Sequence, residues 1–218
     1  MLAWENSYPK GNIRAVLGVI FNSDLFRSHA AAAQKVKTPF EFVASSVRSL
    51  RSSTNGGTGI TATTDGASFA APLTRMGGMN LFDRDAPDGY PEFAPNWISS
   101  GTLVERIRYI QAFCNAGTGD DAGNNQCDPV GLLKSRLPSG TSGGYNDAGA
   151  VTDFFLSILL PGEGAANLAL YRQAGINFLN TDNDGVTSSP FAQLSTNYDT
   201  RVRGLVSMLM TSPRFQEQ

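Results

Sequence analysis

Hydrophobic residues recur at helical spacing in several separate stretches of this chain, and capping signals mark where those stretches begin. The box Thr38-x-x-Glu41, with Pro39 at the first helical position, predicts a helix over residues 39–51. A second box, Thr102-x-x-Glu105, predicts another helix with Arg106 and Arg108 directed outward. Its side chains predicted to face the core are Leu103, Val104, Ile107, Ile110 and Cys114.

Further helices are predicted over residues 129–136, 147–160 and 163–179. Residues 52–66 are too polar to bury and predict a loop, and residues 76–98 predict a long irregular segment that packs through its aromatic rings. No stretch alternates with period two. We therefore expect a mainly α fold, an irregular helical bundle with long Gly-, Pro- and Asn-rich loops and little or no sheet, forming a single helical domain over residues 1–218.

One hydrophobic phrase occurs twice without a gap, over residues 13–26 and 202–215. Each copy is a short apolar helix that stops at a serine, with a phenylalanine three residues later, Phe26 in the first copy and Phe215 in the second. A helix that is apolar on nearly every side has to be buried. We therefore expect the helices over 13–21 and 200–210 to be buried in one core, with each phenylalanine folding back onto it.

Composition narrows the class of protein. Of the 218 residues, 41% are hydrophobic, which is enough to form a core. The net charge of −2 provides no basic field that would attract nucleic acid, so no nucleic-acid partner is expected. The longest apolar run, over residues 154–160, is much shorter than the roughly 20 residues that cross a bilayer. We expect no membrane span, and no signal peptide within this chain.

Cys114 and Cys127 bracket a stretch of small and polar residues that has little to order it. A disulfide closing such a loop would contribute on the order of 3 kcal/mol by restricting the unfolded chain. The spacing predicts this disulfide and an oxidising compartment, and the alternative is two unpaired thiols. A single histidine, His29, and the lack of a third cysteine argue against a zinc site.

Residues 180–185 place oxygen-bearing side chains at alternate positions before a glycine, as at the start of a helix-loop calcium site. The predicted ligands are Asn180, Asp182, Asp184 and Ser188. The twelfth position is Phe191, where a tight site has a bidentate glutamate. The pattern fits either a weak Ca²⁺ site or an Asx-rich turn after a helix, and no other cofactor is expected.

The pattern Gly140-x-Ser142-x-Gly144 has the letters of a nucleophile elbow, which needs a strand before it and a helix after it. The preceding stretch reads as a helix that ends at a proline. His29, the only candidate base, lies upstream of the serine. The pattern therefore fits a flexible linker, or a serine esterase with Ser142 as nucleophile and His29 as base.

Three carboxylates, Asp83, Asp85 and Asp88, lie beside Tyr90 and Trp97. Paired carboxylates next to exposed rings are typical of a glycoside-cleaving or sugar-binding surface, which would make a carbohydrate the ligand. The same residues fit an irregular loop whose acids face water and whose rings face the core.

The motifs Lys37-Thr38-Pro39-Phe40-Glu41-Phe42, Pro87-Asp88-Gly89-Tyr90 and Thr211-Ser212-Pro213-Arg214-Phe215, with Trp97 and Arg106, form a recognisable set. Together they resemble the C-terminal half of the bacterial "domain of unknown function 1800" family. The resemblance implies a helical, exported (periplasmic or extracellular) protein without an assigned activity. Members are usually longer, so it also implies a C-terminal fragment whose partner is the N-terminal half of the full-length protein or another protein.

Two classes of function follow from these observations. The first is a helical structural or interaction module of an exported bacterial protein, and the second is a hydrolase centred on Ser142 or on the carboxylates at 83, 85 and 88. A hydrolase needs its nucleophile, acid and base to converge in one pocket, whereas a module can leave such groups scattered on loops.

Overall fold

The computed structural model describes residues 11–28, 35–50, 67–80, 82–91, 93–115, 127–193 and 196–217. Within these ranges the chain is helical, and its β contacts are two isolated bridges, Val36 with Glu217 and Thr181 with Ser188. The predicted mainly α fold is confirmed. In the same ranges, no helix is both long enough and apolar enough to span a bilayer.

The α-helices are α2 (Ile13–Phe21), α3 (Asp24–Arg27), α4 (Pro39–Ser49), α5 (Ala67–Arg75), α6 (Ser100–Cys114), α7 (Pro129–Lys134), α8 (Ala148–Leu159), α9 (Ala165–Leu179) and α10 (Tyr198–Thr211). Short 3-10 turns are η1 (Ala94–Asn96), η3 (Phe191–Gln193) and η4 (Pro213–Gln216). Helices α4, α7, α8 and α9 start within two residues of their predicted starts. The capping box of α4 is formed as expected, because Thr38 accepts from the Glu41 amide while the Glu41 carboxylate accepts from the Thr38 amide.

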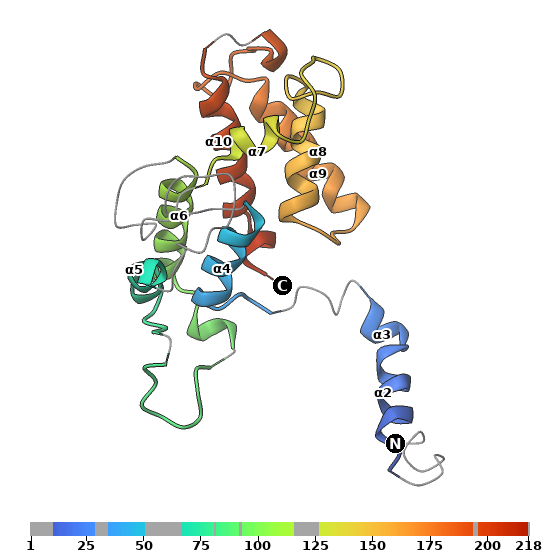
Figure 1. Ribbon diagram of the computed structural model, residues 1–218, viewed down its shortest axis with the longest axis vertical. Helices are drawn as coiled ribbons and strands as arrows, with labels where there is room; N and C mark the ends of the chain where they lie inside the picture. Colours follow the sequence, from blue (N-terminus) through green and yellow to red (C-terminus); the bar gives the residue numbers. More distant parts are fainter. Residues whose placement is uncertain are drawn as a thin grey trace.

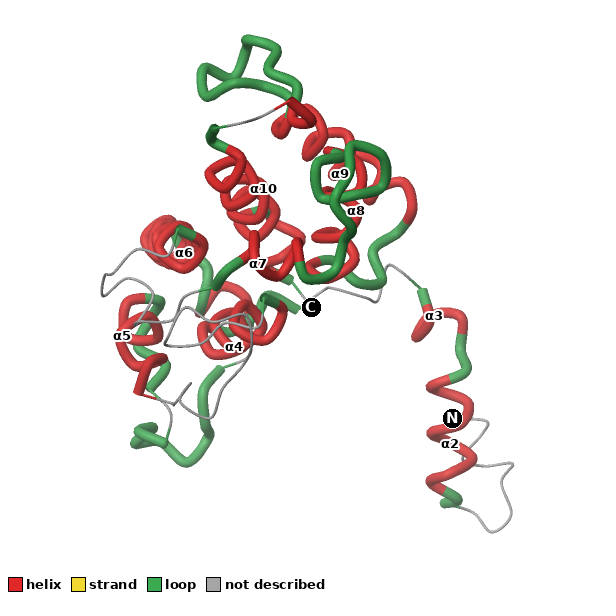
Figure 2. The backbone as a smooth tube through the Cα atoms, turned by 45° about the horizontal axis from the view of Figure 1, so that its top comes forward, coloured by secondary structure: helices red, strands yellow, loops and turns green. Residues whose placement is uncertain are grey.

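Helix α10 lies at the centre of the bundle, between α6 on one side and α7, α8 and α9 on the other (Figures 1 and 2). Its side chains that face this core are Val202, Leu205, Val206, Leu209 and Met210. Phe215 in η4 is 1% exposed and packs edge-on against Phe42 of α4, with ring centroids 5.8 Å apart. The prediction that the second copy of the repeated phrase is buried is therefore confirmed.

Two glycines allow α8, α9 and α10 to approach closely. A Cβ at Gly175 of α9 would lie 2.6 Å from Cγ2 of Thr152 in α8 and 3.1 Å from Leu205 in α10. A Cβ at Gly204 of α10 would lie 2.8 Å from the Phe178 ring. All three distances are shorter than an ordinary carbon–carbon contact, so a larger residue at either position would force the neighbouring side chains to shift.

The prediction for the first copy of the phrase is wrong. Helices α2 and α3 form an arm, residues 13–27, that contains no buried residue and stands away from the bundle (Figures 1 and 2). Phe26 is 54% exposed and packs on Phe21 of the arm itself, with centroids 5.0 Å apart. The phrase specifies an apolar helix, but burial depends on a second surface that the rest of the described chain does not supply here.

The orientation of helix α6 is predicted only in part, and Arg108 is exposed as predicted. Its capping box is formed by Ser99 and Thr102, so the helix begins before the predicted Thr102 and Glu105 box. Arg106, predicted outward, is fully buried, while the predicted core residues Leu103, Val104 and Ile107 are 36–46% exposed. Ile110 and Cys114 are buried as predicted, together with Tyr109 and Phe113. The buried guanidinium is tolerated because it finds acceptors inside the bundle, described below.

The predicted disulfide is also absent: Cys114 and Cys127 are free thiols, and both are buried. The Cys127 thiol donates to the Phe113 carbonyl at 3.3 Å, and burial raises its pKa well above the usual value. Core packing therefore anchors both ends of the intervening stretch without a covalent link.

Residues 52–66, predicted to be a loop, lie outside the described residues. Helix α5 was not predicted, because Pro72 interrupts its pattern.

Candidate functional site

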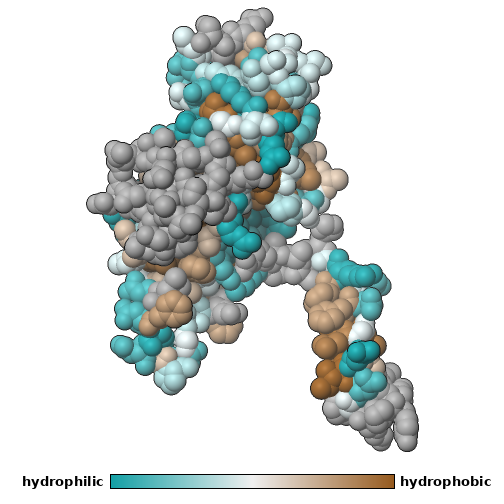
Figure 3. Space-filling view, in the orientation of Figure 1, coloured by the Kyte–Doolittle hydropathy of each residue, from teal (hydrophilic) through white to brown (hydrophobic). Residues whose placement is uncertain are grey.

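The arm presents a continuous apolar face. Asn12 caps α2 through the Ala15 amide, and Ser23 caps α3 through the Phe26 amide, so a helix ends and restarts at residues 22–23. The large apolar side chains that lie exposed on the arm are Ile13, Leu17, Val19, Ile20, Phe21, Leu25 and Phe26, at 42–76% exposure. The space-filling view shows this hydrophobic surface along the arm (Figure 3). Exposed apolar surface of this extent is typical of a docking element.

A second candidate is a pocket of about 450 Å³ between α4, the α8–α9 turn and η4. Ser45 and Ser49 line it from α4, and Glu163, Arg214 and Glu217 form an ionic wall. Glu163 pairs with Arg214, which also bonds Glu217 at 3.2 Å. A hydrogen bond from Asn167, reinforced by Arg214, lowers the pKa of Glu163.

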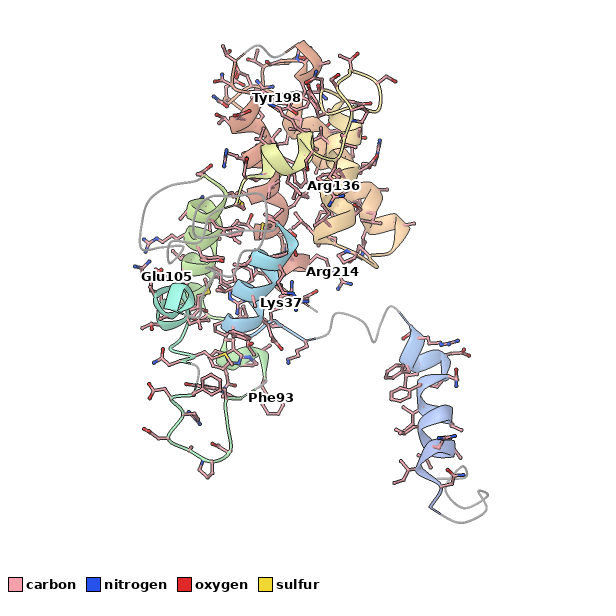
Figure 4. The ribbon with its side chains drawn as sticks, in the orientation of Figure 1. Lys37, Phe93, Glu105, Arg136, Tyr198 and Arg214 are labelled. Carbon is pink, nitrogen blue, oxygen red and sulfur yellow. The ribbon has the colours of Figure 1, made fainter. Side chains whose placement is uncertain are left out.

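Lys37 lies at the wall of this pocket with only 8% of its surface exposed (Figure 4). Its Nζ donates to the Phe215 carbonyl at 2.7 Å and lies 4.0 Å from the centroid of the Phe215 ring. Burial and, secondarily, the nearby charge of Arg106 lower the pKa of Lys37 from 10.5 to about 8, against the opposing effect of Glu41. The pocket therefore contains an amine whose pKa lies closer to physiological pH than that of an ordinary lysine.

Arg106 is the second buried cation of this region. Its guanidinium donates to the Gln216 side-chain oxygen at 3.0 Å and to the Lys37 carbonyl at 2.7 Å, and it stacks over the Phe42 ring at 4.9 Å. Its Nε has no hydrogen-bond partner within the described part of the chain, and burial lowers the pKa of Arg106 to about 10. Both of these acceptors are neutral, and through them Arg106 links α6 to the start of α4 and to the C-terminal segment.

The predicted calcium loop is closed by its own hydrogen bonds. The Asn180 side-chain oxygen accepts from the Phe191 amide at 3.0 Å, and the Asp182 amide donates to the Thr187 carbonyl at 2.8 Å. Asp184 accepts from the Val186 and Thr187 amides and from the Thr187 hydroxyl, which lowers its pKa to about 2. Phe191, at the position of the missing glutamate, is 1% exposed and stacks on Tyr198.

A buried arginine occupies the inner side of this loop. Arg201 donates to the carbonyls of Leu179 and Ser189 and to the Asp182 carboxylate at 3.2 Å. Ser188 is exposed on the outer side. No group of three or more His, Cys, Asp or Glu side chains is placed to hold a metal in the described ranges. The Ca²⁺ site stays a prediction, in which an ion would compete with Arg201 for Asp182.

Ser142 lies in an exposed loop between α7 and α8. Asp147, the N-cap of α8, holds this loop by accepting from the Gly143 amide at 2.8 Å. A helix, α7, precedes the serine where the elbow needs a strand. His29 lies outside the described residues.

Asp83, Asp85 and Asp88 are exposed on the loop over residues 82–91. Tyr90 and Trp97 do not form an open platform: Trp97 is 3% exposed and donates to the Pro91 carbonyl, and the Tyr90 hydroxyl donates to the Asn80 carbonyl. Phe82 and Phe93 are exposed, so the prediction that this segment packs through its rings is wrong for these two. This loop and the loop that carries Ser142 lie at opposite ends of the bundle (Figures 1 and 2). The structure thus does not bring these two candidate centres together.

The motifs that carry the family resemblance lie together in the fold. Two buried cations, Lys37 and Arg106, join the stretch from Lys37 to Phe42 to the closing segment through Phe215. The sequence profile described as "Protein of unknown function (DUF1800)" matches residues 2–217. The chain belongs to the DUF1800 family. No curated protein and no solved structure is detectably similar to it. In this DUF1800 chain, sequence reasoning missed Lys37 and Arg106 as buried groups, although the motif that contains Lys37 was the available signal.

Proposed function

We propose that this chain is a helical interaction module that docks to a protein partner through the arm. The observation that carries the proposal is the exposure of the arm: its copy of the repeated phrase has the composition of a core helix, yet none of its residues is buried. In the second copy, by contrast, the apolar side chains of α10 that face the core are buried, and so is Phe215 of η4. The partner is the N-terminal half of a longer DUF1800 protein, or another protein that offers an apolar groove.

The separation of the candidate catalytic residues supports this proposal over a hydrolase. Ser142 and the carboxylates at 83, 85 and 88 lie on exposed loops at opposite ends of the bundle. Hydrolysis of a nitrophenyl ester that is lost in Ser142→Ala would contradict the interaction role. Export of the protein is a further proposal from the family resemblance, and the buried free thiols give it no support.

The two phenylalanines of the repeated phrase provide a matched test. Phe215→Ala should lower the free energy of unfolding by about 3–5 kcal/mol, because it removes a fully buried ring. Phe26→Ala should leave the unfolding of the isolated, dilute chain unchanged within about 0.5 kcal/mol, because Phe26 is 54% exposed and, among the described residues, its ring packs on Phe21 of the arm. Urea unfolding followed by circular dichroism measures both changes.

Binding of an apolar dye tests docking capacity directly. In dilute solution, the wild-type chain should bind anilinonaphthalene sulfonate, and Leu17→Ser with Phe21→Ser and Phe26→Ser should remove most of that fluorescence. Leu170→Ser is the matched control, because Leu170 is 71% exposed but lies singly on α9. In samples that light scattering shows to be monomeric, equal dye binding by the arm variant and the wild type would refute the docking role, as would a large loss of core stability in Phe26→Ala.

A further inference from the structure

The outer face of α6 carries an apolar groove of about 410 Å³. Its lining includes Val36, Ile98, Leu103, Ile107 and Pro213, with Glu217 at its rim. Leu103 and Ile107, together with the adjacent Val104, are the residues that the helical pattern assigns to a core and that the fold leaves 36–46% exposed. The groove is therefore the counterpart of the arm: an apolar surface without a partner in the described chain.

The arm has the shape that such a groove accepts. Ile13, Leu17, Ile20 and Phe21 recur at i, i+4, i+7 and i+8 and so share one face of α2. Laying an apolar helical face into a hydrophobic groove is a standard mode of helix recognition. At about 1.5 Å per residue, the nine residues of α2 span about 13 Å. The groove residues on α6 extend over one helical turn, from 103 to 107, and Ile98 and Pro213 extend the surface beyond it.

We propose that the arm of one copy of this chain occupies the α6 groove of a second copy, and that the exchange is reciprocal. This inference rests on the proposed function, since it names the partner of the same arm. Connectivity favours exchange between copies: only residues 28–35 separate the arm from Val36, which itself lines the groove. A short connection between an exposed element and the edge of its receptor surface is the arrangement from which swapped dimers form.

The area available is sufficient for a dimer. The large apolar side chains of one arm, about half exposed, offer on the order of 500 Å². Covering two arms removes on the order of 1,000 Å² of arm surface from water, and the groove surface adds to this, so the contact reaches the lower end of the range of specific interfaces. A single arm folded onto its own groove would bury half of this area.

Disulfide trapping between two variants tests the exchange. One chain carries Ile20→Cys, the other carries Ile107→Cys, and the mixture is oxidised; Cys114 and Cys127 are at most 1% exposed and do not compete. We expect a covalent heterodimer between the two variants, and a large loss of that product when Leu170→Cys replaces Ile107→Cys. Light scattering of the wild type should give the mass of a dimer, which falls about twofold in Leu17→Asp with Phe21→Asp.

Three outcomes would overturn the exchange. They are a monomeric wild type at high concentration, an equal yield with the Leu170→Cys control, or a link formed within one chain that carries both Ile20→Cys and Ile107→Cys. A monomer whose arm still binds dye would remove the second copy as partner and leave the docking role standing. An arm that binds neither dye nor a second copy would remove both.

Discussion

Replacing Lys37 by methionine should change how the stability of this protein depends on pH. Lys37 is 8% exposed, and its amine is held between the Phe215 carbonyl and the Phe215 ring. Burial, together with the charge of Arg106, lowers its pKa from 10.5 to about 8. Methionine keeps the length of the side chain and removes the titrating group, so the change of the stability difference with pH reports the titration of Lys37.

The sign follows from the two pKa values. Between about pH 8, the pKa of Lys37 in the folded state, and 10.5, its ordinary value, the unfolded chain binds more protons than the folded chain. The contribution of Lys37 to stability therefore rises as pH increases through this window. Below pH 8 both states are charged and the penalty of burying the ammonium is fully present; above 10.5 both are neutral and the penalty is gone. A pKa difference of this size corresponds to about 3 kcal/mol.

Urea unfolding at a series of pH values, for wild type and Lys37→Met, measures the effect as a difference between the two proteins. Other groups titrate in the same range, including Tyr109, whose pKa is raised by burial, but they are common to both proteins. The wild type should gain about 3 kcal/mol relative to Lys37→Met between about pH 7 and pH 11. Lys134→Met, at an exposed lysine, controls for the loss of one positive charge. A constant difference, or one that favours the variant as pH rises, would refute a depressed pKa at Lys37.

Three further predictions concern packing, thiols and metal. Gly175→Ala should lower the free energy of unfolding by about 1–3 kcal/mol, measured by urea unfolding, because its Cβ would lie 2.6 Å from Thr152. Adding Thr152→Ser, which removes the methyl group at that contact, should recover much of the loss. Cys114 and Cys127 should both be alkylated without reductant in denaturant and neither in the folded protein, and a mass showing fewer than two labels in denaturant would contradict the free thiols. If the predicted Ca²⁺ site forms, ~10 mM calcium should raise the melting temperature relative to chelator, and Asp184→Ala should abolish the rise; identical melts would leave only the turn.

Local signals predicted the helices well because they act within a few residues. The Thr38 and Glu41 box formed at the predicted position, and α8 begins one residue from its predicted start. The orientation of α6 was not predictable in this way. Arg106 is buried because it reaches acceptors on Lys37 and Gln216, which lie 69 and 110 residues away in the sequence. A helix with apolar residues on two faces offers no local reason to prefer one of them.

The candidate sites also differ in whether they depend on local sequence or on long-range contacts. The loop over residues 180–185 could be recognised from its spacing, and the structure shows its oxygens accepting hydrogen bonds from its own backbone. The buried pair Lys37 and Arg106 could not, because lysine and arginine in a helical pattern are read as solvent-facing. The pocket beside Lys37 is assembled from α4, the α8–α9 turn and η4, which meet only in the folded bundle.

Two of the wrong predictions share a cause. In the arm and on the outer face of α6, the hydrophobic pattern predicts burial. These side chains are exposed because no part of the described chain covers them. Natural sequences are locally consistent with their folds, and positions that violate this consistency concentrate where the protein serves a function. The two exposed surfaces are both apolar, one is a helix and the other a groove, and they are joined by a short segment of the same chain. A single contact between copies would satisfy both, which is why the arm and the groove are better explained together than as two independent defects of the fold.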